Sequence, residues 1–408
     1  MTRILALGGA GEMGRVAAEA LAASDQVETV IIGDRDLELA TKAAKAIGGK
    51  AKAQQLDITD EVSLRRALDD VDMVVNTVGP YDQFGVIVLD AAIRAGVKYV
   101  DICDDPTPTL DMLKLGERAE AAGVTALIGM GASPGVSNLL AAEAASKLSR
   151  VDELITGWNL DSARPSSNRK GVSAAVVHGM RQISEPIPVV RDGDLKYVDP
   201  LENVAIDYPG IGSGVGRVFG HPEPVTLHRA FPELQRSSNV ALVDGVTTAA
   251  MRGLSWGIGR GALSVRRAAS VAQKLESLMP HHPLAAIGPG SLPPLFALAK
   301  GKSGDRGAVI CTALAQVPGL SMARITGIPL AVGALMLIDV DKPGVHSPET
   351  LLEPEPFFEQ FGPHCLGWVK GAPMSVTTSS LNDDDQNQRQ LNSALLTALC
   401  SPANADDA

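Results

Sequence analysis

Short apolar runs alternate with amphipathic stretches through the first 130 residues of the chain. The apolar runs are nearly continuous, as in RILAL (3–7) and VDMVVNTVG (71–79). Strands that are apolar throughout are typical of a parallel sheet covered by helices on both faces. The pattern predicts strands at 3–7, 28–34, 52–58, 71–79, 98–103 and 124–130, and helices at 12–23, 37–48, 61–70, 85–96 and 109–123. With right-handed crossovers, this order predicts an α/β fold with a doubly wound parallel sheet of the Rossmann type.

The pattern changes after residue 131, where shorter apolar runs are separated by glycine and proline. A helix is predicted to continue to residue 149, and a polar stretch at 162–171 reads as a loop. The remaining pattern predicts strands at 151–160, 186–198, 204–208, 224–230 and 302–316, and a helical region at 266–300. Short strands of this kind indicate a second α+β domain that contains a mixed sheet.

These changes in pattern also predict the domain boundaries. We expect the first domain at residues 1–130 and the second at 131–324. Residues 325–365 open with ITGIPLAVGALMLI, which predicts a buried helix that returns to the first domain. Polar and acidic residues dominate 366–408, so this C-terminal segment is expected to be partly disordered.

Composition and charge disfavour several classes of protein. Hydrophobic residues form 45% of the 408 positions and charged residues 20%, as in globular proteins. The formal net charge of −11 disfavours nucleic acid as a partner. Because no apolar segment reaches the length of a membrane span and no signal peptide is recognisable, we expect a cytoplasmic protein without a membrane partner. The four cysteines are too scattered for a disulfide framework or a zinc site, and no metal is expected.

Four glycines crowd into GGAGEMG (8–14), between the first predicted strand and the first predicted helix. Gly9, Gly11 and Gly14 form the pattern G-x-G-x-x-G, which allows a tight turn, a close approach of a pyrophosphate and close helix–strand packing. The amides of the intervening Ala10, Glu12 and Met13 then lie at the positive end of the helix dipole, where they can bind the pyrophosphate. The sequence therefore predicts a dinucleotide-binding turn.

An acidic residue, Asp34, ends the second predicted strand twenty positions after Gly14, where a carboxylate can accept hydrogen bonds from the adenosine ribose. Its charge favours NAD, whereas the neighbouring Arg35 would attract the 2′-phosphate of NADP. We therefore expect NAD, with NADP possible. Asp57 and Ile58, after the third predicted strand, are expected beside the adenine; a role for Asp57 as a helix cap is an equal alternative.

Further candidates lie at the carboxyl ends of the other predicted strands, because ligands of open parallel sheets bind at that edge. Tyr81 and Asp104 are candidate catalytic residues, since a phenol or a carboxyl group at a strand exit can transfer protons. Each also has an alternative structural role in its loop. Further cofactor contacts are expected from Thr77, Val78, Gly79, Pro80 and Asp101, and substrate contacts from Ser133, Pro134 and Gly135.

Several segments carry a resemblance to a known family. GGAGEMGRVAAEALA, NTVGPYDQFGVIVLDAAIRAGVKYVDICDD, AAGVTALIGMGASPGVSNLLA, GHPEPVTLHRAFPEL and TGIPLAVGALML resemble the saccharopine dehydrogenase-like oxidoreductases, up to about residue 365. The resemblance implies a Rossmann domain, a second domain that forms the substrate pocket and a dimer interface, and a late helix that returns to the first domain. It also implies the use of NAD or NADP to oxidise or form a C–N bond of an amino-acid-type substrate through an imine.

An amine or imine substrate of this kind needs a proton partner for its nitrogen and a cation for its carboxylate. His178 and His221 are candidates for the proton partner, because imidazole titrates near neutral pH, and the resemblance places His221 near the pocket. Arg181, Arg217 and Arg229 are candidates for the cation. We expect a small-molecule substrate and a homodimer.

Two alternatives remain open from the sequence. Some relatives of this family reduce activated carbon–carbon double bonds, although their counterpart of DICDD (101–105) differs from the one here. A protein of a different class, a sensor that binds NAD(H) without catalysis, would use the same fold.

Overall fold

The computed structural model describes residues 1–159, 172, 174–278, 292–319 and 321–381. The chain divides into two compact units. The first comprises Met1–Leu139 and Ala323–Cys365, and the second comprises Leu140–Met322 and Leu366–Ala408. The first unit thus extends past the predicted boundary at residue 130, and the predicted segment 325–365 falls within it.

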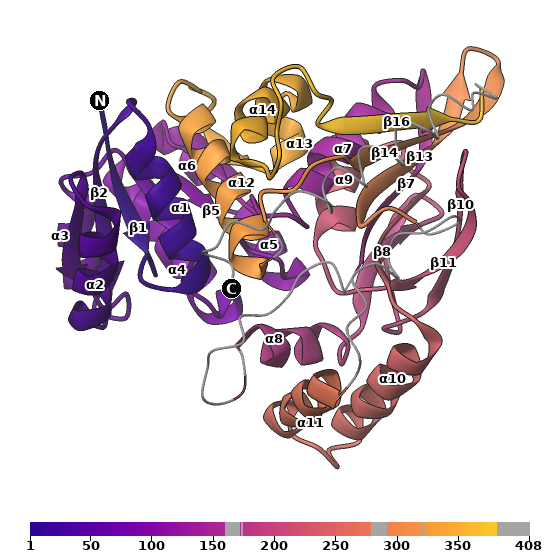
Figure 1. Ribbon diagram of the computed structural model, residues 1–408, viewed down its shortest axis with the longest axis horizontal. Helices are drawn as coiled ribbons and strands as arrows, with labels where there is room; N and C mark the ends of the chain where they lie inside the picture. Colours follow the sequence, from indigo (N-terminus) through magenta and orange to yellow (C-terminus); the bar gives the residue numbers. More distant parts are fainter. Residues whose placement is uncertain (160–171, 173, 279–291, 320, 382–408) are drawn as a thin grey trace. The chain divides into compact units, whose positions relative to one another are not determined.

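The first unit is built on a parallel sheet whose described part has seven strands (Figure 1). The strand order is β15-β6-β5-β4-β1-β2-β3, and every pair is parallel. The strands are β1 (Thr2–Leu7), β2 (Val27–Asp34), β3 (Ala51–Gln55), β4 (Met73–Asn76), β5 (Lys98–Asp101), β6 (Thr125–Leu127) and β15 (Gly344–His346). The order reverses between β1 and β4, where an open α/β sheet forms its ligand crevice. The predicted doubly wound sheet is confirmed.

Helices connect these strands and cover the sheet. They are α1 (Glu12–Ala23), α2 (Leu37–Ile47), α3 (Glu61–Leu68), α4 (Tyr81–Ala95), α5 (Pro106–Leu113) and α6 (Gly116–Ala122). The segment predicted as one helix at 109–123 is therefore two helices, α5 and α6. The two helices are separated by Lys114 and Leu115, so this prediction was wrong in detail.

The chain returns to the first unit through α12 (Met322–Leu337), as the sequence predicts for a buried helix. Gly327 lets this helix approach α1 closely, since a Cβ at Gly327 would lie 2.7 Å from the backbone oxygen of Met13. At the other end, the Lys98 ammonium donates to the backbone oxygens of Leu337, Ile338 and Val340 at 2.8–2.9 Å. These bonds satisfy carbonyl groups that a helix end leaves unpaired. Beyond α12 lie β15, α13 (Pro348–Leu351), α14 (Pro354–Phe361) and the short 3₁₀ helix η2 (Gly362–His364).

The second unit is built on a mixed sheet of nine strands among the described residues. Its main path is β10-β11-β12-β7-β13-β14-β16, and β8 branches from β12 and pairs with β9. The pair β12–β7 is parallel and the others are antiparallel. The strands are β7 (Arg150–Asn159), β8 (Ile187–Arg191), β9 (Asp194–Val198), β10 (Asn203–Tyr208), β11 (Gly212–Val218), β12 (Arg236–Leu242), β13 (Leu295–Ser303), β14 (Arg306–Leu314) and β16 (Ser375–Ser379). This confirms the predicted mixed sheet.

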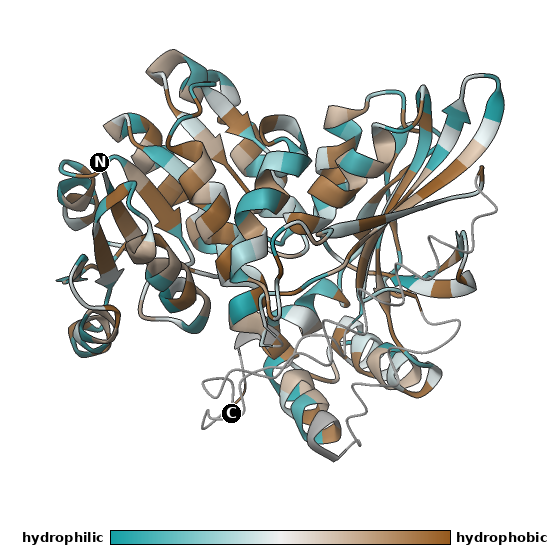
Figure 2. Ribbon diagram, turned by 45° about the horizontal axis from the view of Figure 1, so that its top comes forward, coloured by the Kyte–Doolittle hydropathy of each residue, from teal (hydrophilic) through white to brown (hydrophobic). Residues whose placement is uncertain are grey.

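The chain enters the second unit within α7 (Val136–Ala145). Four further helices belong to it: α8 (Ala174–Gln182), α9 (Glu223–Ala230), α10 (Gly245–Gly259) and α11 (Val265–Leu278). Both α8 and α10 pack on α11, and α9 packs on β7, β8 and β12. Figure 2 shows hydrophobic residues along the strands of each unit, where their buried side chains form the cores.

Two predictions for the second unit were wrong, and two helices were missed. Residues 224–230, predicted as a strand, lie in α9, and the helical prediction for 266–300 covers the start of β13. The helices α8 and α10 were not predicted. The predicted loop at 162–171 lies outside the described residues, as does the C-terminal segment beyond residue 381; before that point, the segment supplies β16.

Cys103, Cys311 and Cys365 are buried free thiols, and Cys400 lies outside the described residues. In the part of the chain that the structure describes, none of the helices combines the length and the apolar character needed to cross a bilayer.

Candidate functional site

The turn between β1 and α1 sets the geometry of the candidate cofactor site. Gly8 has a φ of +70°, and its N–H donates to the backbone oxygen of Gly33 at 2.9 Å, which fixes the turn against the end of β2. Gly11 is the N-cap of α1 and has no side chain that could cap the helix. The backbone N–H groups of the first helical turn therefore point beyond the helix end, where an anion can accept them.

The glycines leave the space that a pyrophosphate needs. A Cβ at Gly14 would lie 2.4 Å from the backbone oxygen of Gly8 and 2.6 Å from Oγ1 of Thr77, so this position admits no side chain. A Cβ at Gly11 would meet the oxygen of Gly8 at 3.1 Å and otherwise project into space that the described atoms leave open within 4 Å. The residues thus fit a dinucleotide: Gly14 allows the turn to pack, and Gly11 leaves room for a ligand.

Asp34 lies at the carboxyl end of β2, half-buried, and its Oδ1 accepts a hydrogen bond from the Asp36 N–H at 3.1 Å. Arg35 is exposed, and its backbone oxygen accepts a bond from the side-chain amide of Gln55 at 3.3 Å. The carboxylate is therefore held by the backbone at the end of β2, while the guanidinium extends into solvent.

The structure contradicts one of the two predicted roles of Asp57, which follows β3: Asp57 does not cap the next helix. The helix α3 is capped by Asp60, whose side chain accepts from Val62 N and Ser63 N, and not by Asp57. Oδ1 of Asp57 instead accepts two bonds from Thr59, at 2.7 and 2.9 Å, which lower the pKa of the Asp57 carboxyl. Asp57 is exposed, whereas the next residue, Ile58, is buried.

Residues 77–80 connect β4 to α4 beside the glycine turn. Oγ1 and N of Thr77 both donate to the backbone oxygen of Leu7 at 2.9 Å, so the ends of β4 and β1 are tied together. The N–H of Val78 donates to the Asn76 side chain at 3.0 Å, and Pro80 is the N-cap of α4. Gly79 is exposed. The structure thus places these four predicted cofactor residues in the loop after β4, next to the glycine turn.

Asp101 was predicted to contact the cofactor, but its carboxylate is used inside the first unit. Oδ1 accepts from the N–H groups of Gly129 and Cys103 at 2.7 and 3.0 Å, and Oδ2 accepts from the Tyr99 hydroxyl at 2.8 Å. Burial raises the pKa of the Asp101 carboxyl to about 6, although these hydrogen bonds oppose the shift. The geometry favours a role in joining β5 to the chain after β6 over a cofactor contact.

Tyr81, a predicted proton donor, is also buried in the first unit, where its hydroxyl makes two hydrogen bonds to the backbone. Its hydroxyl donates to the backbone oxygen of Asn76 at 2.9 Å and accepts from the Ile102 N–H at 3.4 Å. Burial, together with the nearby Asp101, raises the pKa of the Tyr81 phenol well above its usual range. Since a phenol with these bonds holds its proton tightly, the geometry favours a structural role.

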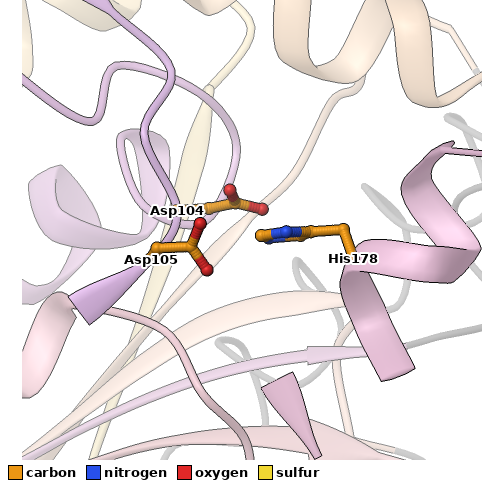
Figure 3. Close-up of side chains that lie close together, drawn as sticks. All are labelled: Asp104, Asp105 and His178. Carbon is orange, nitrogen blue, oxygen red and sulfur yellow. The ribbon is translucent and has the colours of Figure 1, made fainter. Parts of the chain in front are cut away.

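Asp104 follows β5 and is half-buried; Asp105 after it is the N-cap of α5, and His178 lies on α8 of the second unit (Figure 3). Asp104 remains a candidate from its place at the strand exit.

After β6, the predicted substrate residues 133–135 form a tight loop in which Gly131 N donates to the Pro134 oxygen at 2.9 Å. Gly135 N donates to the Asn138 side chain at 2.9 Å.

In the second unit, His178 and Arg181 share one face of α8, three residues apart, with His178 half-buried and Arg181 exposed. Arg217 lies on β11 and is half-buried, whereas Arg229 is exposed on α9. The end of α8 approaches the segment after β11, because a Cβ at Gly220 would lie 2.7 Å from the backbone oxygen of Gln182. The structure therefore brings the end of α8, at Gln182, to the segment that holds His221.

His221 is buried at the start of α9 and is surrounded by residues that the sequence analysis missed. Its ring stacks on Trp158 with centroids 5.2 Å apart and an interplanar angle of 5°. The buried polar residues Glu223 and Asn239 lie close by, and Asn239 is hydrogen-bonded to Glu223 and Trp158. An asparagine directly before the apolar residues of β12 was the available signal, since a buried amide needs hydrogen-bond partners.

The chain is similar to several known proteins. Residues 4–127 match the family described as the saccharopine dehydrogenase NADP binding domain. A protein named carboxyaminopropylagmatine dehydrogenase, from a Synechocystis species, is 25% identical over 398 residues, which cover 88% of this chain and 95% of that protein. The structure of apo histidine-tagged saccharopine dehydrogenase (L-Glu forming) from Saccharomyces cerevisiae matches with a TM-score of 0.58 and 17% identity. That match covers 93% of this chain and 100% of the yeast chain.

The family match spans β1 to β6, and so includes the glycine turn and Asp34. The yeast structure shares the fold of both units. Residues 4–127 therefore form a domain of the saccharopine dehydrogenase NADP-binding type, and the chain as a whole is similar to NAD(P)-dependent dehydrogenases of the saccharopine dehydrogenase kind.

Proposed function

We propose that this protein transfers a hydride to or from the carbon of a C–N bond in an amino-acid-type substrate, with NAD as its cofactor. One observation carries the proposal: the similarity to a dehydrogenase named for an amine compound extends over nearly the whole of both chains. It therefore includes the second unit, where the substrate residues are predicted, as well as the cofactor-binding unit. The same likeness makes reduction of a carbon–carbon double bond the less favoured alternative.

The chain's own residues have separable tasks in this reaction. The turn at Gly9–Gly14 holds the pyrophosphate, and Asp34 accepts hydrogen bonds from the adenosine ribose. A nicotinamide held by this turn would supply the hydride chemistry, as the acceptor when an amine is oxidised and as the donor when an imine is reduced. His221 takes the proton that the amine nitrogen loses during oxidation and returns it during reduction. Arg181 and Arg217 are the cations for a substrate carboxylate, and His178 is a second proton carrier.

The preference for NAD over NADP rests on Asp34. Its carboxylate is fixed at the end of β2 by the Asp36 N–H, so a 2′-phosphate on the ribose would meet a negative charge that cannot move away. The exposed Arg35 is the group that would offset this repulsion in NADP. Because the guanidinium lies in solvent, its attraction for the phosphate is screened and weaker than that of a buried charge.

Replacement of Asp34 tests this preference. We expect wild-type protein to bind NADH at least about tenfold more tightly than NADPH, and Asp34→Ala to remove most of that difference, a change of roughly 1.4 kcal/mol. Fluorescence titration with each reduced nucleotide measures both affinities. Asp25→Ala, which removes an exposed carboxylate before the opposite end of β2, is the matched control and should leave the preference intact. An unchanged preference in Asp34→Ala would remove Asp34 from cofactor selection.

The reaction itself is tested with purified protein and a panel of amino acids, N-substituted amino acids and amine–oxoacid pairs. Nicotinamide absorbance is followed in both directions, with an activated enone or enoyl thioester in a parallel series. We expect turnover with an amine or imine and none with the carbon–carbon double bond. Reduction of the double bond alone would overturn the proposal in favour of the alternative.

A further inference from the structure

The second unit contains a buried carboxylate, Glu223, which was not among the predicted site residues. Glu223 is the first residue of α9 and has no exposed surface. The helix packs its start against β7 and β12, whose residues Thr156 and Asn239 are also fully buried. A carboxylate in such a position is costly unless donors and an opposite charge compensate its lost hydration.

Hydrogen bonds fix one side of this carboxylate. The Asn239 side-chain NH₂ donates to Oε1 of Glu223 and to Oγ1 of Thr156, each at 2.9 Å, and Oδ1 of Asn239 accepts from the Trp158 indole N–H at 3.1 Å. An indole nitrogen can only donate, so the amide oxygen must face Trp158 and the NH₂ group must face Glu223. The orientation of Asn239 is thus determined by its partners, and Oε1 of Glu223 is held in place.

The other side of the carboxylate faces His221. Nδ1 of His221 lies 3.9 Å from Oε2 of Glu223, which is within ion-pair range but longer than a hydrogen bond. The imidazole is held between two aromatic rings: it stacks on Trp158, and it meets Phe219 edge-on with centroids 5.4 Å apart. Both rings restrict the tilt of the imidazole, and Nδ1 is the nitrogen that lies against the carboxylate, so Nε2 is the nitrogen left for a substrate.

Among the described residues, the elements that pack near this imidazole contribute both uncharged and titratable groups, including His228 and Arg229 of α9 itself. The residues that β7 and β12 contribute to the network, Thr156, Trp158 and Asn239, carry no charge. Helix α8, which approaches the segment at Gly220, carries His178 and Arg181 as its titratable groups. Within the part of the chain that the structure describes, Glu223 places a carboxylate against His221. An opposite charge at this distance favours the protonated form of an imidazole, whereas burial disfavours it.

We propose that Glu223 is a positioning residue that keeps the proton of neutral His221 on Nδ1 and stabilises the imidazolium, so that Nε2 exchanges the proton with the substrate. This inference rests on the proposed function. When an amine is oxidised, the carbon loses a hydride with its electron pair, the nitrogen loses a proton to Nε2, and a C=N bond forms. In the reverse direction, the imidazolium returns that proton to the nitrogen. Glu223 stays ionised in both directions, and the hydrogen bond from Asn239 keeps its carboxylate in position.

The direct test is an NMR titration of the full-length protein carrying ¹⁵N-labelled histidine, with the His221 signals assigned from their loss in His221→Asn. In wild-type protein, we expect the neutral ring to show the chemical shifts of the Nδ1–H tautomer. In Glu223→Gln, we expect the pKa of His221 to fall by at least about one unit, a tenfold change in proton affinity. Glu233→Gln, which neutralises an exposed carboxylate just after α9, is the matched control and should leave the pKa of His221 unchanged.

Two outcomes would overturn the proposal: an Nε2–H tautomer in the wild-type protein, or the same pKa of His221 in wild type and Glu223→Gln. The tautomer is measured in the wild-type protein and needs only His221→Asn for the assignment, so it decides the question even if Glu223→Gln does not fold. Glu223→Asp retains the charge and should restore at least part of the pKa.

Kinetics separate this proposal from the proposed function. With an amine substrate, we expect Glu223→Gln to lower kcat by roughly 10- to 100-fold with little change in KM, and to shift the pH profile of kcat to lower pH. A loss confined to KM would contradict a role in proton transfer. If no amine or imine is turned over, the proposed function fails, while the tautomer and the pKa still report whether Glu223 positions His221.

Discussion

Gly14→Ala will destabilise the first unit and remove its affinity for nicotinamide nucleotides. The added Cβ would lie 2.4 Å from the Gly8 oxygen and 2.6 Å from Oγ1 of Thr77, and the first of these atoms belongs to the backbone of the turn itself. The turn must shift to relieve the contact, at a cost of about 3 kcal/mol in the free energy of unfolding. Since the shift displaces the amides that hold the pyrophosphate, we expect NADH affinity to fall by roughly 100-fold or more. Urea unfolding and fluorescence titration measure the two effects.

Gly11→Ala separates the two effects. At Gly11, the added Cβ meets the Gly8 oxygen at 3.1 Å and otherwise enters open space. We therefore expect a variant with nearly wild-type stability that binds NADH at least about tenfold more weakly, because the methyl group occupies ligand space. Gly49→Ala, where a Cβ would meet nothing within 4 Å, should change neither property. Wild-type affinity in both Gly11→Ala and Gly14→Ala would show that the pyrophosphate binds elsewhere.

Asp101 makes the stability of the first unit depend on pH. Burial raises the pKa of its carboxyl from 3.8 to about 6, so the folded protein binds this proton more tightly than the unfolded chain does. The resulting stabilisation is complete below about pH 4 and is lost as the pH rises to about 6. The two pKa values correspond to about 3 kcal/mol. We expect the unfolding free energy of wild type, relative to Asp101→Asn, to decrease by this amount between pH 4 and pH 7.

Urea unfolding of both proteins at several pH values between 4 and 7 measures this difference. Asp69→Asn, at an exposed position after α3, serves as the control and should follow wild type at every pH. If Asp101→Asn and wild type change in parallel, the Asp101 proton is not held more tightly in the folded protein.

The sequence was sufficient for the first sheet because buried parallel strands leave a strong local signal. Runs such as RILAL and MVVN are apolar on both faces, and the glycines that follow β1 have no other common use in a strand–turn–helix unit. In the second unit the local signal was weaker. Residues 224–230 contain β-branched and apolar residues typical of a strand, yet they form α9, whose early prolines fit the first turn of a helix.

Other segments became strands because they pair with strands that are distant in the sequence. LFALAKGKS resembles a helix by its leucine and alanine content, but as β13 it hydrogen-bonds to β7 on one side and β14 on the other. Such pairing cannot be inferred from local propensity, because the partners lie far away in the chain.

In the candidate site, too, local features were predictable from the sequence and long-range contacts were not. The glycine turn and Asp34 are local features, so spacing identified them. Asp101 stands at a strand end as a cofactor ligand would, but it is committed to Gly129, whose position next to it depends on the whole sheet. Glu223 and His221 are two residues apart, and still their relation becomes visible only through Asn239 and Trp158, which belong to β12 and β7.

The strand order of the first unit has a consequence for biosynthesis. The outer strand β15, which pairs with β6, is encoded after residues 140–322 of the second unit, as is nearly all of α12, whose end is tied to β5 by Lys98. While the ribosome is translating residues 140–322, β6 has no neighbour on that side, and the nascent Rossmann sheet ends in an unprotected strand. Vectorial synthesis thus leaves the earliest-made part of this enzyme incomplete until late in translation, when aggregation competes with closure.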